Sequence, residues 1–172
     1  MVLVISAKSM CSKSSNKAFP AEERSEVLQK LRYFCSSRER HTAEVTEKMK
    51  CLGIPVSEFS SLAEELRKEK FLDDRRFAGA FARGKFRINR WGRLKIRLEL
   101  AGRGIPGELI AEGLLEIDEE EYRSVIRNLV LKKFNEIKGE KKLTIRNKIF
   151  TFVSGKGFEP DLVSETITEL NL

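Results

Sequence analysis

Apolar residues recur every three or four positions through most of the chain, the spacing that places them on one face of an α-helix. The clearest case is 21–36, where Val27, Leu31 and Phe34 share a face and acidic residues occupy the first turn. The same spacing predicts further helices over 43–52, 59–70, 74–88 and 119–138. Thr42 is the expected N-cap of the second of these helices. The chain is therefore predicted to be all-α.

One helix stop signal appears three times, at Gly53, Gly104 and Gly157. Each glycine is followed by an apolar residue and then by a proline, and only the third copy inserts one more residue, Glu159. A glycine in this position ends a helix in the left-handed conformation, and the apolar residue after it packs back onto the last turn. The copies are spaced by about 50 residues, a length typical of repeated helical units.

Apolar residues occupy matching places around the three glycines. Eight residues before each glycine stand, in order, Val45, Ile96 and Ile149, and four before it stand Met49, Leu100 and Val153. A helix, a glycine stop, a proline and a second helix that recur three times predict three tandem three-helix modules. The expected divisions are a flexible basic tail at 1–20 and modules at 21–71, 72–116 and 117–172.

The segment 93–100 is ambiguous, because apolar and polar residues alternate strictly along it, as in a half-buried strand. We favour a helix, since the segment at 43–52 occupies the same place in the first repeat. Such a helix has two apolar stripes, one formed by Ile96 and Leu100 and the other by Leu94 and Leu98. Two stripes are expected if the middle module is covered on both sides.

The basic residues are concentrated in one stretch. Between 75 and 103 the chain has ten Lys or Arg and a single acid, Glu99, whereas the net charge of the whole chain is only +7. A local field of one sign attracts a polyanion or an acidic protein surface. The only tryptophan, Trp91, lies among them and could pack in a core or, with Phe86, stack on a base. Six basic residues form the predicted contact set for a partner or DNA: Arg83, Lys85, Arg87, Arg90, Arg93 and Arg97.

No catalytic constellation stands out. His41 is the only histidine, and the three cysteines, Cys11, Cys35 and Cys51, have no CxxC spacing, so no zinc site or Cys-His pair is indicated. The chain also lacks the GxxxxGK[ST] frame of a phosphate-binding loop. We expect a binding protein without enzyme activity or cofactor, with free thiols and with His41 in a capping or surface role.

Other features fit ordinary structural roles. Asp73, Asp74 and the acidic run at 116–121 are expected to cap or complement the N-termini of helices. The apolar start at 1–5 is too short for a signal peptide or a membrane span. We therefore expect a cytoplasmic protein without a membrane partner.

The segment at 72–86, LDDRRFAGAFARGKF, resembles the L-D-D-x-R-F-A signature that opens the middle module of the RecX family, bacterial regulators of the RecA recombinase. The triple repeat is also that family's plan, and the resemblance covers roughly 22–170. The tail at 1–20 has no counterpart in it. The residues that match the signature, which we interpret as structural, are Leu72, Asp73, Asp74, Arg76, Phe77 and Ala78.

The resemblance implies an elongated, curved, solenoid-like chain of three tandem three-helix modules. It implies a monomeric regulator of DNA recombination and repair that lodges in the groove of the RecA–single-stranded DNA filament. There it would inhibit strand exchange, ATP hydrolysis and filament extension, with no cofactor. The alternative is a stand-alone basic helical protein that binds nucleic acid through units of the helix-turn-helix kind. Binding of single-stranded DNA without a recombinase at physiological salt distinguishes the two.

Overall fold

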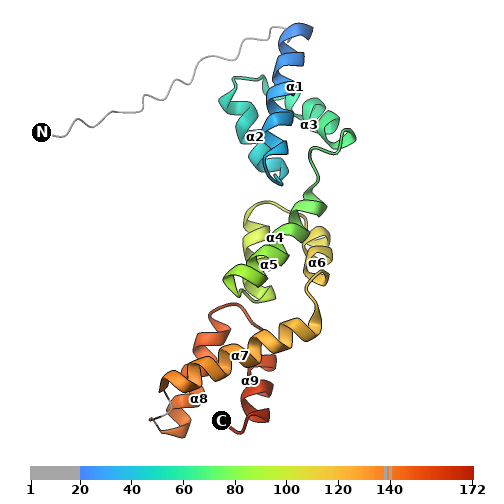
Figure 1. Ribbon diagram of the computed structural model, residues 1–172. Helices are drawn as coiled ribbons and strands as arrows, with labels where there is room; N and C mark the ends of the chain where they lie inside the picture. Colours follow the sequence, from blue (N-terminus) through green and yellow to red (C-terminus); the bar gives the residue numbers. More distant parts are fainter. Residues whose placement is uncertain (1–19, 138, 140) are drawn as a thin grey trace, which may run out of the picture.

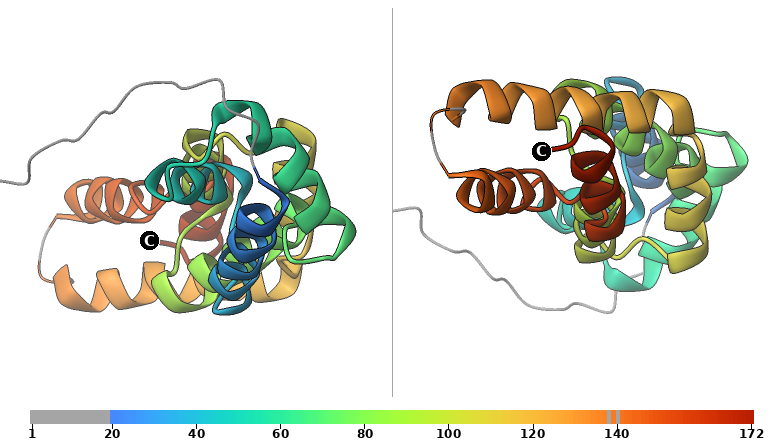
Figure 2. Two further views of the ribbon diagram at one scale, coloured as in Figure 1. Left: turned by 90° about the horizontal axis from the view of Figure 1, so that it is seen from above. Right: turned by 90° about the horizontal axis from the view of Figure 1, so that it is seen from below.

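The computed structural model describes residues 20–137, 139 and 141–172, and over these residues the chain forms α-helices joined by short turns, with no β-strand (Figure 1). Within these ranges nine α-helices follow one another in three groups of three, and the groups lie in an elongated row. Seen along the row, the groups overlap one another (Figure 2). The predicted all-α class and the tandem arrangement of three-helix modules are confirmed.

The three groups are called here the first, middle and third modules. The first holds α1 (Ala21–Ser36), α2 (Thr42–Cys51), a 3₁₀ turn η1 (Val56–Glu58) and α3 (Phe59–Lys68). The middle module holds α4 (Asp74–Asn89), α5 (Arg93–Gly102) and α6 (Gly107–Leu115). The third holds α7 (Glu119–Ile137), α8 (Lys142–Ser154) and α9 (Pro160–Glu169). The expected boundaries at 71/72 and 116/117 fall between helices and stay predictions, and the expected tail lies, apart from Pro20, outside the described residues.

The repeated glycines adopt the left-handed conformation, with φ of 72° at Gly53, 76° at Gly104 and 88° at Gly157. In the first two copies, the N–H after the glycine donates to the carbonyl five residues earlier, at 3.2 Å in both, which closes the turn expected at a glycine-ended helix. The third copy differs, because the Gly157 carbonyl accepts the N–H of Leu94 from the middle module at 3.0 Å. The third turn therefore attaches one module to another.

The apolar positions that repeat in the sequence form the centre of each module. All six are buried, with at most 1% of their surface exposed: Val45, Met49, Ile96, Leu100, Ile149 and Val153. Truncating one fully buried aliphatic side chain to alanine costs about 2–5 kcal/mol, so these positions account for much of each module's stability.

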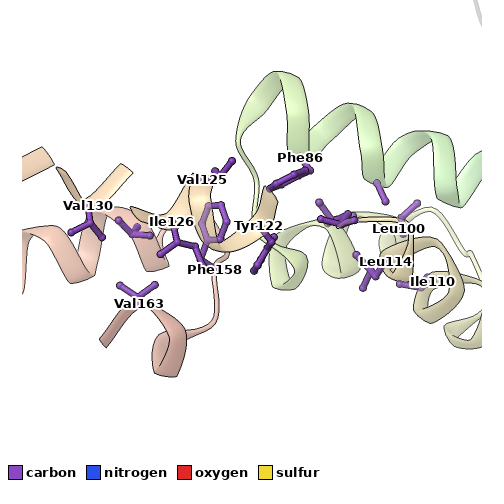
Figure 3. Packing of buried hydrophobic residues seen from close by; sticks show 14 of the residues in the cluster. Phe86, Leu100, Ile110, Leu114, Tyr122, Val125, Ile126, Val130, Phe158 and Val163 are labelled. Carbon is purple, nitrogen blue, oxygen red and sulfur yellow. The ribbon is translucent and has the colours of Figure 1, made fainter. Parts of the chain in front are cut away.

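The buried residues form two separate cores. One core belongs to α1–α3 and is completed by Leu72. The other runs without a break from Phe77 in α4 to Ile167 in α9, so the middle and third modules share it. Figure 3 shows Tyr122 and Phe158 at the point where the apolar side chains of these two modules meet. Two modules are therefore joined by a common core, whereas the first is joined to them without one.

The ambiguous segment 93–100 is helical, as favoured, and forms most of α5. Ile96 and Leu100 are fully buried, but Leu94 and Leu98 have 46% and 74% of their surface exposed. The expectation that both stripes are covered is therefore wrong. The middle module meets its neighbours through α4 and the turns that flank α5, so the second stripe of α5 faces solvent.

The expected N-cap of α2 is wrong by one residue, since the helix begins at Thr42 and His41 occupies the N-cap position. The side chain of His41 makes no capping hydrogen bond and is only 7% exposed, so neither the capping nor the surface role holds. Asp74 supplies the missing acceptor, because its carboxylate accepts the Thr42 N–H at 2.8 Å. His41 does not cap the helix, and its ring packs on Phe77 instead, with the ring centroids 4.9 Å apart.

Candidate interaction surface

The two aspartates of the signature cap helices in two different modules. Asp73 caps its own helix, α4, by accepting the Arg76 N–H at 3.0 Å. Asp74 reaches back to the first module, where its carboxylate accepts both the N–H and the hydroxyl of Thr42, at 2.8 and 2.5 Å. A carboxylate at a helix N-terminus also offsets the positive end of the helix dipole. The pair therefore ties the start of α2 to the start of α4.

The other signature residues lie at the same junction. Leu72 is buried in the core of the first module, and Phe77 packs on His41. The guanidinium of Arg76 donates to the Glu39 carboxylate at 2.7 Å and to a backbone carbonyl at 3.0 Å. Ala78 is fully buried where α4 and α6 approach so closely that a Cβ on Gly113 would lie 2.9 Å from the Ala78 backbone. These contacts of the motif are thus internal to the chain.

Half of the predicted basic contact set forms ion pairs within the chain. The acids come from the run at 116–121, which the sequence places far from the arginines. Exposed pairs of this kind each contribute about 0–1 kcal/mol, so they orient the arginines more than they stabilise the fold. The three pairs are Arg83–Glu116, Arg87–Glu121 at 3.2 Å and Arg93–Glu119 at 2.8 Å.

The other half of the set has no acidic partner within ion-pair distance among the described residues. Arg90 ends α4 in the left-handed conformation, with φ of 55°, and Arg97 projects from α5. The ammonium of Lys85 lies 4.9 Å from the centroid of the Trp91 ring, and that of Lys95 lies 4.5 Å from it. Trp91 packs partly against the core, as the first sequence alternative expected, and stacking of Trp91 on a base stays a prediction.

A similar stack of lysines on an aromatic ring continues on the third module. The ammonium groups of Lys133 and Lys156 each lie 5.3 Å from the centroid of the Phe152 ring. The carbonyl of Lys156 accepts the N–H of Gly92 at 2.9 Å. Because Gly92 comes next to Trp91 in the sequence, the two stacks lie near each other across the junction of the modules. Each contact between a cation and a ring contributes about 0.5–1 kcal/mol at an exposed site.

A buried tyrosine connects the middle and third modules. The Tyr122 hydroxyl donates to the Glu159 carboxylate at 2.5 Å and accepts the Arg93 N–H at 3.0 Å. Burial, followed by the hydrogen bond to Glu159, raises the pKa of Tyr122 well above its usual range. The ring lies between Phe86 and Phe158, with centroids 5.5 and 5.1 Å away. Phe86 therefore belongs to the core and is not available to stack on a base.

Comparison with known proteins decides the family. The model of "RecX, second three-helix domain" matches residues 73–114. The chain is 31% identical over 133 residues to "Regulatory protein RecX" of Prosthecochloris aestuarii, a match that covers 77% of this chain and 85% of that protein. The chain belongs to the RecX family. All residues of its signature except Leu72 lie inside the matched domain.

Two further RecX relatives are longer than this chain. The RecX of Geobacillus kaustophilus is 27% identical over 149 residues, which cover 87% of this chain but 55% of that protein. The RecX of Clostridium acetobutylicum is 35% identical over 111 residues, which cover 51% of that protein. The chain therefore spans about half the length of these two curated relatives.

The fold is that of solved RecX structures. The crystal structure of RecX from Lactobacillus salivarius superposes with a TM-score of 0.82 over 88% of this chain and 99% of that one, at 22% sequence identity. A second RecX crystal structure superposes with a TM-score of 0.70 at 18% identity. Likeness at these identities shows that the arrangement of modules is shared.

The described residues of this RecX chain form neither a metal-binding cluster nor a membrane-spanning helix. No group of three or more His, Cys, Asp or Glu among them is placed to hold a metal ion. No helix in the described ranges is long and apolar enough to cross a membrane. Cys35 and Cys51 are free thiols, and burial raises the pKa of Cys35.

Sequence reasoning missed three residues of this surface. Lys133 and Lys156 lie in the next module, 30 and 53 residues after Arg103, where the basic stretch ends, so no signal within that stretch pointed to them. Glu159 did leave a signal, because it is the extra residue in the third repeat. A position inserted before a repeated proline indicates a local function, which here is the acceptor for Tyr122.

Proposed function

We propose that the chain regulates the RecA recombinase by binding the RecA–single-stranded DNA filament. It would lodge in the filament groove and inhibit strand exchange, ATP hydrolysis and filament extension. Relatives that bear the name "Regulatory protein RecX" support a regulatory role. The elongated row of modules supports binding to an extended partner, because a chain of linked modules can contact several sites at once (Figure 1).

Linked contacts strengthen one another. When one module is bound, the next is held near its own site at a high effective concentration, so the affinity of the whole exceeds that of any single module. The middle and third modules share one core, which favours a constant arrangement of their surfaces. The filament, a regular array of protomers, offers the repeated sites that such a chain requires.

The observation that carries the proposal is the set of cations on the middle module that form no close ion pair among the described residues. Arg90 and Arg97 form no ion pair among the described residues, and Lys85 and Lys95 stack on the ring of Trp91. Attraction between these groups and an acidic protomer surface or bound DNA would weaken as salt is added. Arg83, Arg87 and Arg93 stay in the proposed contact set. To contact the partner, each must first break its ion pair with a glutamate of the run at 116–121.

The test is RecA ATPase activity on single-stranded DNA, titrated with the wild type and with a Lys85→Ala, Arg90→Ala, Lys95→Ala variant. We expect the wild type to inhibit at less than one molecule per RecA protomer. The variant should require at least about tenfold more protein, since it lacks three cations of the contact surface. These side chains make no ion pair that holds the modules together, so the variant should keep its fold.

A matched control removes the same amount of charge elsewhere. Lys30→Ala, Lys50→Ala and Arg127→Ala change exposed residues of the first and third modules. The control should inhibit like the wild type, which would show that position and not net charge decides the effect. Absence of inhibition by the wild type itself would overturn the proposed function.

A second candidate function is direct binding of nucleic acid. It is favoured by the lysines that cover Trp91 and Phe152 on adjacent modules, a mixture of cations and rings that suits single strands. Anisotropy of a labelled single-stranded oligonucleotide without RecA, measured at physiological salt, tests it. Tight binding with a steep salt dependence, together with no effect on RecA ATPase, would favour this candidate over filament regulation.

A further inference from the structure

A second basic region lies on the third module. Between 122 and 158 the chain has ten Lys or Arg and two acids, Glu136 and Glu140. This surplus is nearly as large as that of the stretch at 75–103, which has ten Lys or Arg and one acid. Among the described residues, the acidic run at 116–121 pairs with one cation of this region, Arg123, at 3.4 Å. The third module therefore has a positive field of its own, which attracts polyanions.

A groove between α7 and α8 lies within this region. The two helices lie side by side (Figure 2), and the groove has a volume of about 570 Å³. No acid is among the described residues that line it. The four polar lining residues of α8 are exposed and recur every three or four positions, so they share one face of the helix. The polar side chains and the ring of the lining are Lys133, Thr144, Asn147, Lys148, Thr151 and Phe152.

Two lysines at this groove lie over the ring of Phe152. The ammonium groups of Lys133 and Lys156 are each 5.3 Å from the ring centroid, and the ring packs partly against the shared core. Lys133 also pairs with Glu136 at 3.0 Å, but a solvent-exposed pair of this kind is weak. Lys156 has no acid within ion-pair distance among the described residues. Positive charge at the groove thus exceeds negative charge even when Glu136 is counted.

We infer that this groove binds the sugar-phosphate backbone of a single-stranded nucleic acid. Lysines, hydroxyls and side-chain amides are groups with which proteins contact phosphate oxygens, and the lining provides all three. The contacts go to phosphates instead of bases, because the ring of Phe152 packs on the core and lies under two lysines. The inference gives the second candidate function a site, and it does not depend on the recombinase.

Two other occupants fit less well. An acidic protein segment would find one aliphatic side chain in the groove, Ile137, whereas stable protein interfaces depend on apolar or aromatic anchors. A nucleic-acid duplex receives a projecting helix or strand into its own groove, but the site here is concave. A single strand is narrow and flexible enough to follow a concave, positively charged groove.

The test is the anisotropy of a labelled oligothymidine without RecA, measured at several salt concentrations. The first variant removes the charge of the three lysines at the groove: Lys133→Gln, Lys148→Gln and Lys156→Gln. It should bind the oligonucleotide at least about tenfold more weakly, because three phosphate contacts are lost. The slope of log affinity against log salt should also fall by about 2, since each contact to a single strand contributes about 0.7 to that slope.

A second variant leaves all three lysines in place. Asn147→Glu puts a carboxylate on the exposed face of α8 that lines the groove. It should weaken binding at least about fivefold, because the carboxylate repels the phosphates. Glutamate favours a helix and the position is exposed, so the thermal unfolding midpoint should stay at the wild-type value.

Two control variants each remove three positive charges from another module. One changes exposed residues of the first module: Lys30→Gln, Lys50→Gln and Lys68→Gln. The other is the Lys85→Ala, Arg90→Ala, Lys95→Ala variant of the middle module. Both should bind the oligonucleotide within about threefold of the wild type, because the phosphate contacts of the third module are intact.

Several outcomes would overturn the inference. They are wild-type affinity in both groove variants, equal weakening by the middle-module control, no binding by the wild type, and equally tight binding of a duplex of the same length. The RecA ATPase titration decides the proposed function separately. Loss of oligonucleotide binding in the groove variants, with RecA inhibition kept at the wild-type level, would support the inference and the proposed function together.

Discussion

The junction between the first and middle modules is made mainly of charged and polar groups. The junction between the middle and third modules also has ion pairs, Arg87–Glu121 and Arg93–Glu119, but it is made mainly of aromatic rings and backbone hydrogen bonds. At the first, Asp74 binds the start of α2 and Arg76 pairs with Glu39. At the second, Tyr122 is enclosed in a shared core, and Gly92 donates its N–H to the turn after α8.

This difference predicts different strengths. Exposed ion pairs contribute about 0–1 kcal/mol each and weaken in salt, whereas a buried aromatic side chain contributes several kcal/mol that salt does not screen. The core of the first module ends at Leu72, and it meets the shared core where His41 packs on Phe77. We expect two cooperative units, one formed by α1–α3 and the other by α4–α9.

The largest expected effect comes from removing the ring that joins the two modules of the shared core. Tyr122→Ala leaves a cavity between Phe86 and Phe158 and removes the partner of Glu159. The free energy of unfolding of α4–α9 should fall by about 3–5 kcal/mol, as for other buried aromatic residues. Urea denaturation followed by hydrogen exchange measures the loss helix by helix. Equal loss of protection in α1–α3 would contradict the separation into two units.

A smaller effect on the same junction is expected from Gly92→Ala. A Cβ at this position would lie 2.1 Å from the backbone oxygen of Gly157, so the two turns must move apart. The cost should be about 1–3 kcal/mol, the range for overpacking a tight site. Gly84→Ala is the matched control, since it lies within α4 with nothing near its Cβ position. That control should raise stability by about 0.5–1 kcal/mol, because alanine favours a helix.

Much of the fold was predictable because each module repeats the same local rules. The glycine stops were recognisable from sequence alone, since a glycine with positive φ and an apolar residue after it leave a fixed pattern. The helix at 93–102 was ambiguous because it has two apolar stripes, and only the repeat indicated a helix. Its exposed stripe could not be foreseen, since whether Leu94 is covered depends on how the modules are placed.

The interaction surface was less predictable, because charge along a sequence does not show which acids meet which bases. The basic stretch has Glu99 as its single acid, yet the run at 116–121 folds back beside Arg83, Arg87 and Arg93. The signature contains a similar case. Asp74 looked like an ordinary cap of its own helix, but its partner is Thr42, which lies 32 residues earlier in the sequence.

Asp74→Ala should weaken the polar junction by about 0.5–2 kcal/mol, since α2 loses its N-terminal acceptor. The effect should be confined to the first module, and hydrogen exchange at the start of α2 is the direct measurement. Asp161→Ala, in the first turn of α9, is the control for simple loss of an acid near a helix N-terminus. Uniform destabilisation of α4–α9 by Asp74→Ala would show that the two junctions are energetically coupled.

The smallest expected effect is a pH dependence of the same junction. Burial lowers the pKa of His41, and although Glu44 and Asp74 oppose this shift, the net direction is downward from 6.5. Its Nδ1 has no hydrogen-bond partner among the described residues, which a neutral ring tolerates better than a charged one. The folded state therefore favours neutral His41, and the stability it contributes is present above about pH 6.5 and is lost as the pH falls through the lowered pKa.

His41 is the only histidine in the chain, so its contribution can be isolated. Between pH 7.5 and pH 5.5, as values chosen on either side of about 6.5, wild-type α1–α3 should lose more urea resistance than a His41→Asn variant. Asparagine is used because it is a good N-cap residue and does not titrate. Parallel pH profiles for the two proteins would show that His41 is not linked to folding. A steeper wild-type profile confined to α1–α3 would show that the polar junction responds to pH while the aromatic junction does not.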